Sequence, residues 1–121
     1  MSKKLLVIDD SPFIFKAVSK ALEGSSDYEV IGNALDGQLG VEKYIETRAD
    51  VITLDVTMPV MDGLATARKL FEINPNVKII MLSAMGDETL LNDARTIGIK
   101  HFLTKPFRPE TLKEKLSEIF S

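Results

Sequence analysis

Three acidic residues stand directly after apolar runs of the chain. Asp9 and Asp10 follow the run 5–8, and Asp55 follows the run 51–54. Carboxylates that are held close together repel one another, which favours protonation or requires a cation. Carboxylate oxygens in a partly hydrated site suit Mg²⁺, which typically takes one or two carboxylates and keeps several waters. The three acids therefore predict a Mg²⁺ site, provided that the fold brings them together.

A hydroxyl and an ammonium group follow two later apolar runs. Ser83 comes after the run 78–82, and Lys105 comes after the run 99–104. Taken alone, each residue is more often a helix cap or a solvated side chain. Taken with the acids, they fit an aspartate nucleophile that accepts a phosphoryl group, in which catalysis is mostly positioning and charge neutralisation. Lys105 would supply a second cation, and Ser83 a hydroxyl donor to a phosphate oxygen.

The elements that must position these groups are indicated by five short apolar runs. Most are near-continuous in Val, Ile and Leu, which is typical of strands buried on both faces of a parallel sheet. The runs are 5–8, 28–34, 51–54, 78–82 and 99–104. Ligands of open α/β sheets bind at the carboxyl ends of the strands, where all the polar residues named above would lie.

Helical patterns fill the intervals between these runs. Ser11 can cap the first helix, with Pro12 at its first position. The second helix is expected to carry Leu39, Val41, Tyr44 and Ile45; three more are expected near 64–71, 88–97 and 109–119. Five strands that alternate with five helices predict a doubly wound sheet with right-handed crossovers.

Composition excludes several classes of function. The 121 residues predict a single domain, 1–121, with no room for an output domain. The net charge of −3 argues against nucleic-acid binding, and the lack of cysteine excludes thiol chemistry. The N-terminal apolar run is too short for a signal peptide, and no run could span a membrane. We expect a cytoplasmic monomer that binds neither nucleic acid nor membrane.

Four motifs in order resemble the receiver domain of two-component response regulators. They are "VIDDSP", "TLDVTMPVMDG", "MLSAMG" and "FLTKPF", and the resemblance covers essentially the whole chain. The likeness is greatest to the stand-alone chemotaxis type (CheY-like). It implies a flavodoxin-like α/β fold whose five-stranded parallel sheet has the order 2-1-3-4-5.

The resemblance also implies a role for each polar residue at the sheet edge. Asp55 would be the phosphoacceptor, with Lys105 binding the phosphate and Ser83 acting as the switch hydroxyl. Asp9 and Asp10 would bind Mg²⁺ together with Asp55 and the backbone carbonyl of Thr57.

Further positions match the switching parts of the family. Phe102 stands at the aromatic position that turns inward on activation, and the Lys105–Pro106 bond is expected to be cis. The phosphoryl group would come from a sensor histidine kinase, such as a CheA-type kinase. The face made by the fourth helix, fifth strand and fifth helix would then bind a flagellar motor switch or a phosphotransfer protein. Such a protein is not an enzyme beyond its own phosphorylation and dephosphorylation.

The chain departs from the family pattern at some of these positions. Phe15 stands where chemotaxis members often have an arginine, and Phe102 lacks the hydroxyl of the tyrosine common there. Thr57 and Met85 occupy the two positions that tune access of the hydrolytic water, and Met85 offers no hydrogen bond to it. These residues predict slow loss of the phosphoryl group.

Other readings of the sequence remain open. The chain could be a fragment of a larger regulator or a phosphorelay intermediate. An aspartate-nucleophile phosphatase of the haloacid dehalogenase type is remote, because its nucleophile lies in a D-x-D pattern on the first strand, whereas here that strand ends "DDS". A flavodoxin-like binder would need a phosphate loop there, and a pseudo-receiver usually lacks part of the acidic set. His101, the only histidine, is expected to be a surface or packing residue.

Overall fold

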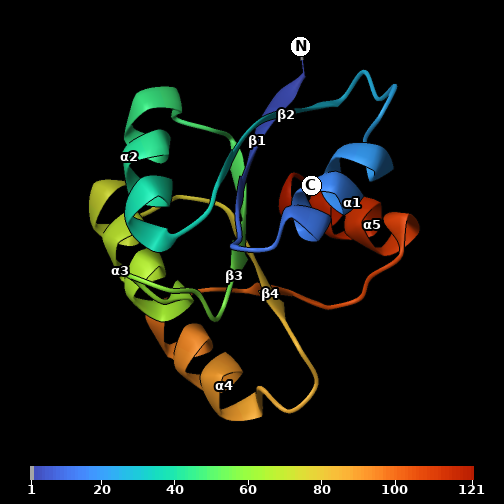
Figure 1. Ribbon diagram of the computed structural model, residues 1–121. Helices are drawn as coiled ribbons and strands as arrows, with labels where there is room; N and C mark the ends of the chain where they lie inside the picture. Colours follow the sequence, from blue (N-terminus) through green and yellow to red (C-terminus); the bar gives the residue numbers. More distant parts are fainter. Residues whose placement is uncertain (1) are drawn as a thin grey trace.

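The computed structural model describes residues 2–121, in which five strands alternate with five helices (Figure 1). The strands are β1 (Lys3–Ile8), β2 (Tyr28–Ala34), β3 (Val51–Asp55), β4 (Ile79–Ser83) and β5 (His101–Thr104). The helices are α1 (Pro12–Ala21), α2 (Gly37–Thr47), α3 (Gly63–Ile73), α4 (Glu88–Ile97) and α5 (Pro109–Ile119). Every strand that the sequence predicts is present, and no strand end is shifted by more than two residues.

The strands form one parallel sheet in the order β2-β1-β3-β4-β5, which confirms the expected doubly wound fold. Helices α2, α3 and α4 lie on one side of the sheet, and α1 and α5 lie on the other (Figure 1). The order reverses direction between β1 and β3, because the chain first adds β2 on one side of β1 and then β3 on the other. Such a switch point is where open α/β sheets bind ligands.

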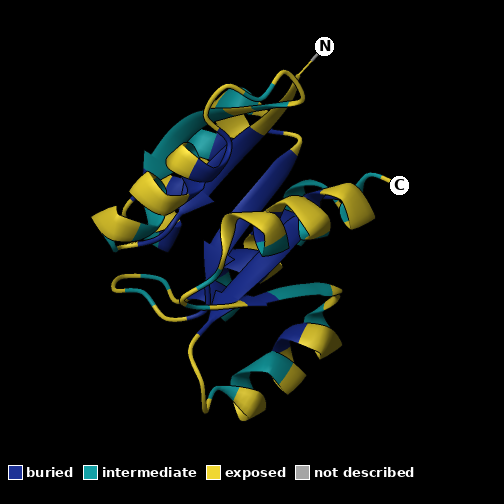
Figure 2. Ribbon diagram, turned by 90° about the vertical axis from the view of Figure 1, so that its right-hand side faces the viewer, coloured by how far each residue is buried: buried dark blue, intermediate teal, exposed yellow. Residues whose placement is uncertain are grey.

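The core has two layers because alternate residues of a strand point to opposite faces. Leu6 and Ile8 of β1 belong to the layer that packs on α2 and α3, whereas Leu5 and Val7 belong to the layer that packs on α1 and α5. Both layers are closed to solvent, so the sheet is buried along its centre while the outer helix faces are exposed (Figure 2). This accounts for the near-continuous apolar runs.

The apolar face of α2 differs from the sequence prediction. Val41 and Tyr44 are buried as expected, but Leu39 and Ile45 are about half exposed. Their place against the sheet is taken by glycine, since a Cβ on Gly40 would lie 2.6 Å from Cδ1 of Ile8. The helix approaches β1 too closely for a side chain at Gly40, and Leu39 and Ile45 lie outside the face that packs on the sheet.

Candidate functional site

Four of the strand ends deliver polar side chains to one edge of the sheet. Asp9 follows β1, Asp55 is the last residue of β3, Ser83 is the last residue of β4, and Lys105 follows β5. Because β1 and β3 are neighbours, their two carboxylates meet at the switch point. Asp9, Asp55 and Ser83 are buried, whereas Asp10 is exposed. The structure therefore brings the expected residues to one site but places the two adjacent acids in different environments.

Asp55 is a buried carboxylate with two donors. Its Oδ1 accepts hydrogen bonds from Lys105 Nζ at 3.1 Å and from the backbone N–H of Thr57 at 3.3 Å. Burial and the nearby charge of Asp9 raise the pKa of Asp55 to about 6, and Lys105 offsets this only in part. The side chain is thus held in a site where its negative charge is incompletely compensated.

Asp9 is fully buried, and only one of its two carboxylate oxygens has a hydrogen-bond partner. Its Oδ1 accepts a hydrogen bond of 2.8 Å from the backbone N–H of Ser11, at the start of α1. Its Oδ2 has no hydrogen-bond partner and lies 3.5 Å from Lys105 Nζ. Burial raises the pKa of Asp9, against the lowering effects of Ser11 and Lys105. A buried carboxylate oxygen without a partner is costly, so this oxygen is available to a cation.

The donor set fits a hard divalent cation. Asp9, Asp10 and Asp55 each offer a carboxylate oxygen, and these oxygens lie within 4.8 Å of one another. Two of the three acids are buried and the third reaches solvent, which suits an ion that retains part of its water shell. The unpartnered Oδ2 of Asp9 is the observation that favours a cation here over a plain cluster of acids.

Lys105 is anchored from its backbone. The Lys105 N–H donates to the carbonyl of Ser83 at 2.7 Å, and the Lys105–Pro106 bond is cis. Its side chain is 23% exposed, so the stem is largely covered while Nζ reaches Asp55 and Asp9. The ammonium is therefore shared between two carboxylates rather than paired with one.

The loop after β3 is folded tightly against the acceptor strand. The Gly63 N–H donates to the carbonyl of Val56 at 3.0 Å, and a Cβ on Gly63 would collide with the Asp55 carbonyl. Val60 adopts φ 68°, a left-handed conformation that is unfavourable for a β-branched residue. Because of that collision, position 63 has no room for a side chain.

The remaining residues from the sequence prediction lie around this centre. Phe102 is half-buried, and the guanidinium carbon of Arg95 lies 4.9 Å from its ring centroid. Thr57 and Met85 are exposed at the rim, with Met85 at 91%. Both positions are thus open to solvent.

This arrangement defines an open α/β protein with an acidic, lysine-bridged centre at its topological switch point. The profile of the response regulator receiver domain matches residues 5–117. The chain belongs to this family, whose members are phosphorylation-dependent signalling switches in chemotaxis and other two-component systems.

Several relatives of the chain are chemotaxis proteins. CheY of Thermotoga maritima is 39% identical over 119 residues, which is 98% of each chain, and CheY of Listeria monocytogenes is 40% identical over 115 residues, 95% of this chain and 96% of that one. Among solved structures, a chain of the CheX–CheY–BeF3–Mg²⁺ complex of Borrelia burgdorferi has a TM-score of 0.90 and 33% identity, covering 98% of this chain and 90% of that one. The chain is thus a CheY-like receiver domain, similar to proteins of chemotaxis signalling.

The longest helices described within residues 2–121 have 11 residues. Within this part of the chain, none of the helices is both long enough and apolar enough to cross a bilayer.

Proposed function

We propose that the protein is a switch that accepts a phosphoryl group on Asp55 from a histidine kinase, in the presence of Mg²⁺. The observation that carries this proposal is the shared contact of Lys105 Nζ with Asp55 at 3.1 Å and Asp9 at 3.5 Å, beside an unpartnered carboxylate oxygen. Such a centre holds an excess of negative charge that a cation and a phosphoryl-transfer reaction both use. Residues 1–121 act here as one receiver domain.

Asp55 is the nucleophile of the proposed reaction. A carboxylate oxygen of Asp55 forms a bond to phosphorus as the bond between phosphorus and the histidine nitrogen of the donor breaks, and that nitrogen keeps the electron pair. Lys105 Nζ and the Thr57 N–H hold the carboxylate in place. The reaction requires the ionised form of Asp55, which is favoured when a cation offsets the charge of Asp9.

Asp9, Asp10, Asp55 and the backbone carbonyl of Thr57 would hold Mg²⁺. When bound, the ion supplies positive charge for the oxygens of the transferring phosphoryl group. The solved relative from Borrelia burgdorferi is described as a complex with BeF3 and Mg²⁺, which supports the same ion for this chain.

The switch works through a change of local charge. Phosphorylation adds about −1.5 to −2 units of charge at Asp55. Ser83, which ends the strand next to β3, donates its hydroxyl to a phosphate oxygen, and Phe102 turns into the space that Ser83 leaves. The α4–β5–α5 face thereby changes shape and binds a downstream partner, such as a motor-switch, CheX-like or phosphotransfer protein.

The central experiment is phosphorylation by acetyl phosphate with Mg²⁺, followed by intact-mass measurement. The wild type should gain one phosphoryl group, and Asp55→Asn should gain none. Asp62→Asn is the matched control, because Asp62 lies in the same loop and caps α3 through a bond to the N–H of Ala65, which asparagine can also make. Labelling that survives in Asp55→Asn contradicts the acceptor assignment.

Two further measurements test the finer parts of the proposal. Lys105→Met should slow labelling about hundredfold, because it removes the ammonium that neutralises the reacting centre. The phosphoryl group should persist for minutes, since Met85 cannot orient water; a lifetime of seconds contradicts this. Multiple turnover of a phosphate monoester would instead indicate the phosphatase alternative, and transfer to a histidine phosphotransfer protein would indicate a relay.

A further inference from the structure

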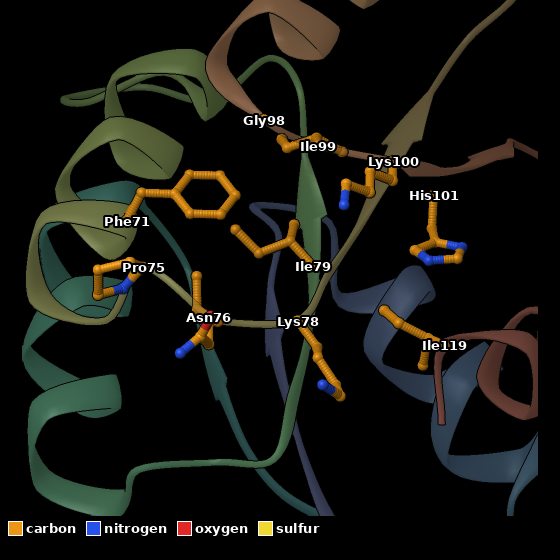
Figure 3. Close-up of a pocket in the computed structure, with 11 residues that line it drawn as sticks. Phe71, Pro75, Asn76, Lys78, Ile79, Gly98, Ile99, Lys100, His101 and Ile119 are labelled. Carbon is orange, nitrogen blue, oxygen red and sulfur yellow. The ribbon is translucent and has the colours of Figure 1, made fainter. Parts of the chain in front are cut away.

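The turns at the two ends of β4 are closed by side chains in different ways. In the turn that enters β4, beside the hollow of Figure 3, the Asn76 N–H donates to Asn74 Oδ1 at 3.0 Å. Such a contact between residues two apart is common in turns. In the turn that leaves β4, the Ala84 N–H donates to Asp87 Oδ2 at 2.8 Å. Asp87 directly precedes α4, so it stands at the position whose side chain normally caps a helix.

Helix α4 lacks the side-chain cap that two other helices have. Three of the described helices begin directly after an aspartate, namely Asp36 before α2, Asp62 before α3 and Asp87 before α4. The first two aspartates each accept from the N–H three residues along, which is Leu39 at 2.9 Å and Ala65 at 2.8 Å. Asp87 accepts from no described N–H of α4, where the same spacing gives Leu90. Its carboxylate thus holds the preceding turn and leaves the first turn of its own helix uncapped.

The backbone of Asp87 differs from that of the two capping aspartates. Asp36 and Asp62 have ψ 171°, in the extended region that is usual for a residue that caps a helix. Asp87 instead has ψ 19°. The preceding Gly86 has φ +93°, which glycine adopts readily, and a Cβ on it would meet no described atom within 4 Å. Residues 84–86 are exposed, so this turn has room to adjust if Asp87 becomes extended.

The Ala84 N–H points toward β3, the strand that ends in Asp55. The Ser83 carbonyl accepts from the Lys105 N–H at 2.7 Å, and Lys105 follows β5 on the other side of β4. The C=O and N–H of a trans peptide point in opposite directions, so the Ala84 N–H points away from β5. Asp55 pairs with Leu82, two residues before Ala84. A negative group added to Asp55 therefore lies on the side that this N–H faces.

We propose that Asp87 exchanges hydrogen-bond partners when Asp55 is phosphorylated, an inference that rests on the proposed function. The added charge of about −1.5 to −2 repels the Asp87 carboxylate and competes with it for the Ala84 N–H. The released carboxylate accepts from the Leu90 N–H and caps α4, whose N-terminal N–H groups favour a negative side chain. Asp87 is thus a positioning residue that couples Asp55 to the start of α4, by a route that does not include Phe102.

The test measures hydrogen exchange of backbone amides by NMR in the full chain, with and without excess acetyl phosphate and Mg²⁺. Without label, Asp87→Ala should speed exchange of the Ala84 amide about fivefold, since its acceptor is gone, and leave Leu90 unchanged. With label, exchange of the Leu90 amide should slow about fivefold in the wild type, and Asp87→Ala should lose this slowing. The Leu39 amide, which Asp36 caps, should respond in neither protein.

Glu88→Ala is the matched control, because it removes the same charge from the next residue, which is exposed. It should keep the slowing at Leu90 in full. Three results overturn the exchange of partners: a labelled wild type whose Leu90 amide does not slow, slowing that survives in Asp87→Ala, and slowing that Glu88→Ala also abolishes. Intact mass of the same samples identifies a different failure, since a wild type that takes no phosphoryl group refutes the proposed function itself and this exchange with it.

Discussion

The two edges of the sheet treat their polar groups in opposite ways. At the carboxyl edge, Asp9 and Asp55 are buried with raised pKa values, and one oxygen of Asp9 has no hydrogen-bond partner. At the amino edge, Asp50 accepts from the Lys4 N–H at 2.7 Å, and the side-chain amide of Asn74 donates to the hydroxyl of Tyr44 at 3.0 Å. At the carboxyl edge the sheet thus holds buried charges that are incompletely compensated. At the amino edge these two polar side chains in the turns have hydrogen-bond partners.

This difference indicates that residues at the carboxyl edge serve function, whereas residues at the amino edge serve stability. Buried charges without full compensation destabilise a fold, and they persist where chemistry uses them. Substitutions at the carboxyl edge should therefore change activity and can raise stability, whereas those at the amino edge should only lower stability. The predictions below test this separation, from the largest effect to the smallest.

The largest effect is expected for Gly63→Ala. The new Cβ would collide with the Asp55 carbonyl and lie 2.6 Å from Cα of Val56, so the loop must move away from β3. The free energy of unfolding should fall by about 3 kcal/mol, measured by urea denaturation, and acetyl phosphate labelling should fall with it. Gly24→Ala at the amino edge, where φ is +77° and nothing lies within 4 Å, should cost about 1 kcal/mol and leave labelling unchanged. Equal effects of the two variants would break the comparison.

Asp55→Asn should stabilise the metal-free protein at neutral pH. The pKa of Asp55 is raised from the ordinary 3.8 to about 6, so the folded state binds the proton more tightly than the unfolded state. Stability therefore falls as pH rises from 3.8 to 6, and the ionised group remains destabilising above that range. In EDTA at pH 7.5 the variant should gain about 2 kcal/mol, and the gain should vanish near pH 3.5.

The matched control for that gain is Asp50→Asn at the amino edge. Asp50 Oδ2 accepts from a backbone N–H in an exposed turn, and an asparagine oxygen can accept the same bond. Its effect should stay within about 0.5 kcal/mol. A gain for Asp50→Asn that matches the gain for Asp55→Asn would show that removal of any acid stabilises this acidic protein.

Tyr44→Phe should lower stability without touching activity. Tyr44 is buried, and its loss of a hydroxyl leaves the amide of Asn74 without its partner. The expected cost is about 1 kcal/mol in urea denaturation. Tyr28→Phe is the control, because the hydroxyl of Tyr28 makes no hydrogen bond within the described chain. Impaired labelling in Tyr44→Phe would contradict the separation of the two edges.

Val60→Gly is expected to give the smallest effect, and its sign is unusual for a change to glycine. Relief of the left-handed backbone at φ 68° favours the folded state, while the added freedom of glycine favours the unfolded state. The net gain should be about 0.5 kcal/mol by urea denaturation. Val30→Gly in β2 lacks such relief and should destabilise; a loss for both variants would contradict strain at Val60.

Much of the fold and of the candidate site can be predicted from the sequence. Runs of Val, Ile and Leu predict the strands, and the site follows because parallel strands end at one edge of the sheet. Three features depend on tertiary contacts that no pattern encodes. These are the exposure of Leu39, on a helix whose Gly40 packs against Ile8; the different burial of Asp9 and Asp10; and the hollow beside the turn that enters β4, which forms only where two distant turns meet.

The strand order has a consequence for how the protein is made. Within this domain, Asp9 and Asp55 precede Lys105 in the chain, and Lys105 directly follows β5. A growing chain that has not yet added β5 holds the two buried acids without their ammonium partner. In such a chain Asp9 and Asp55 repel each other with no ammonium group beside them. Addition of β5 then brings Lys105 to the two carboxylates and also buries apolar side chains. Charge compensation of the two buried acids therefore requires that β5 has joined the sheet and brought Lys105 to them.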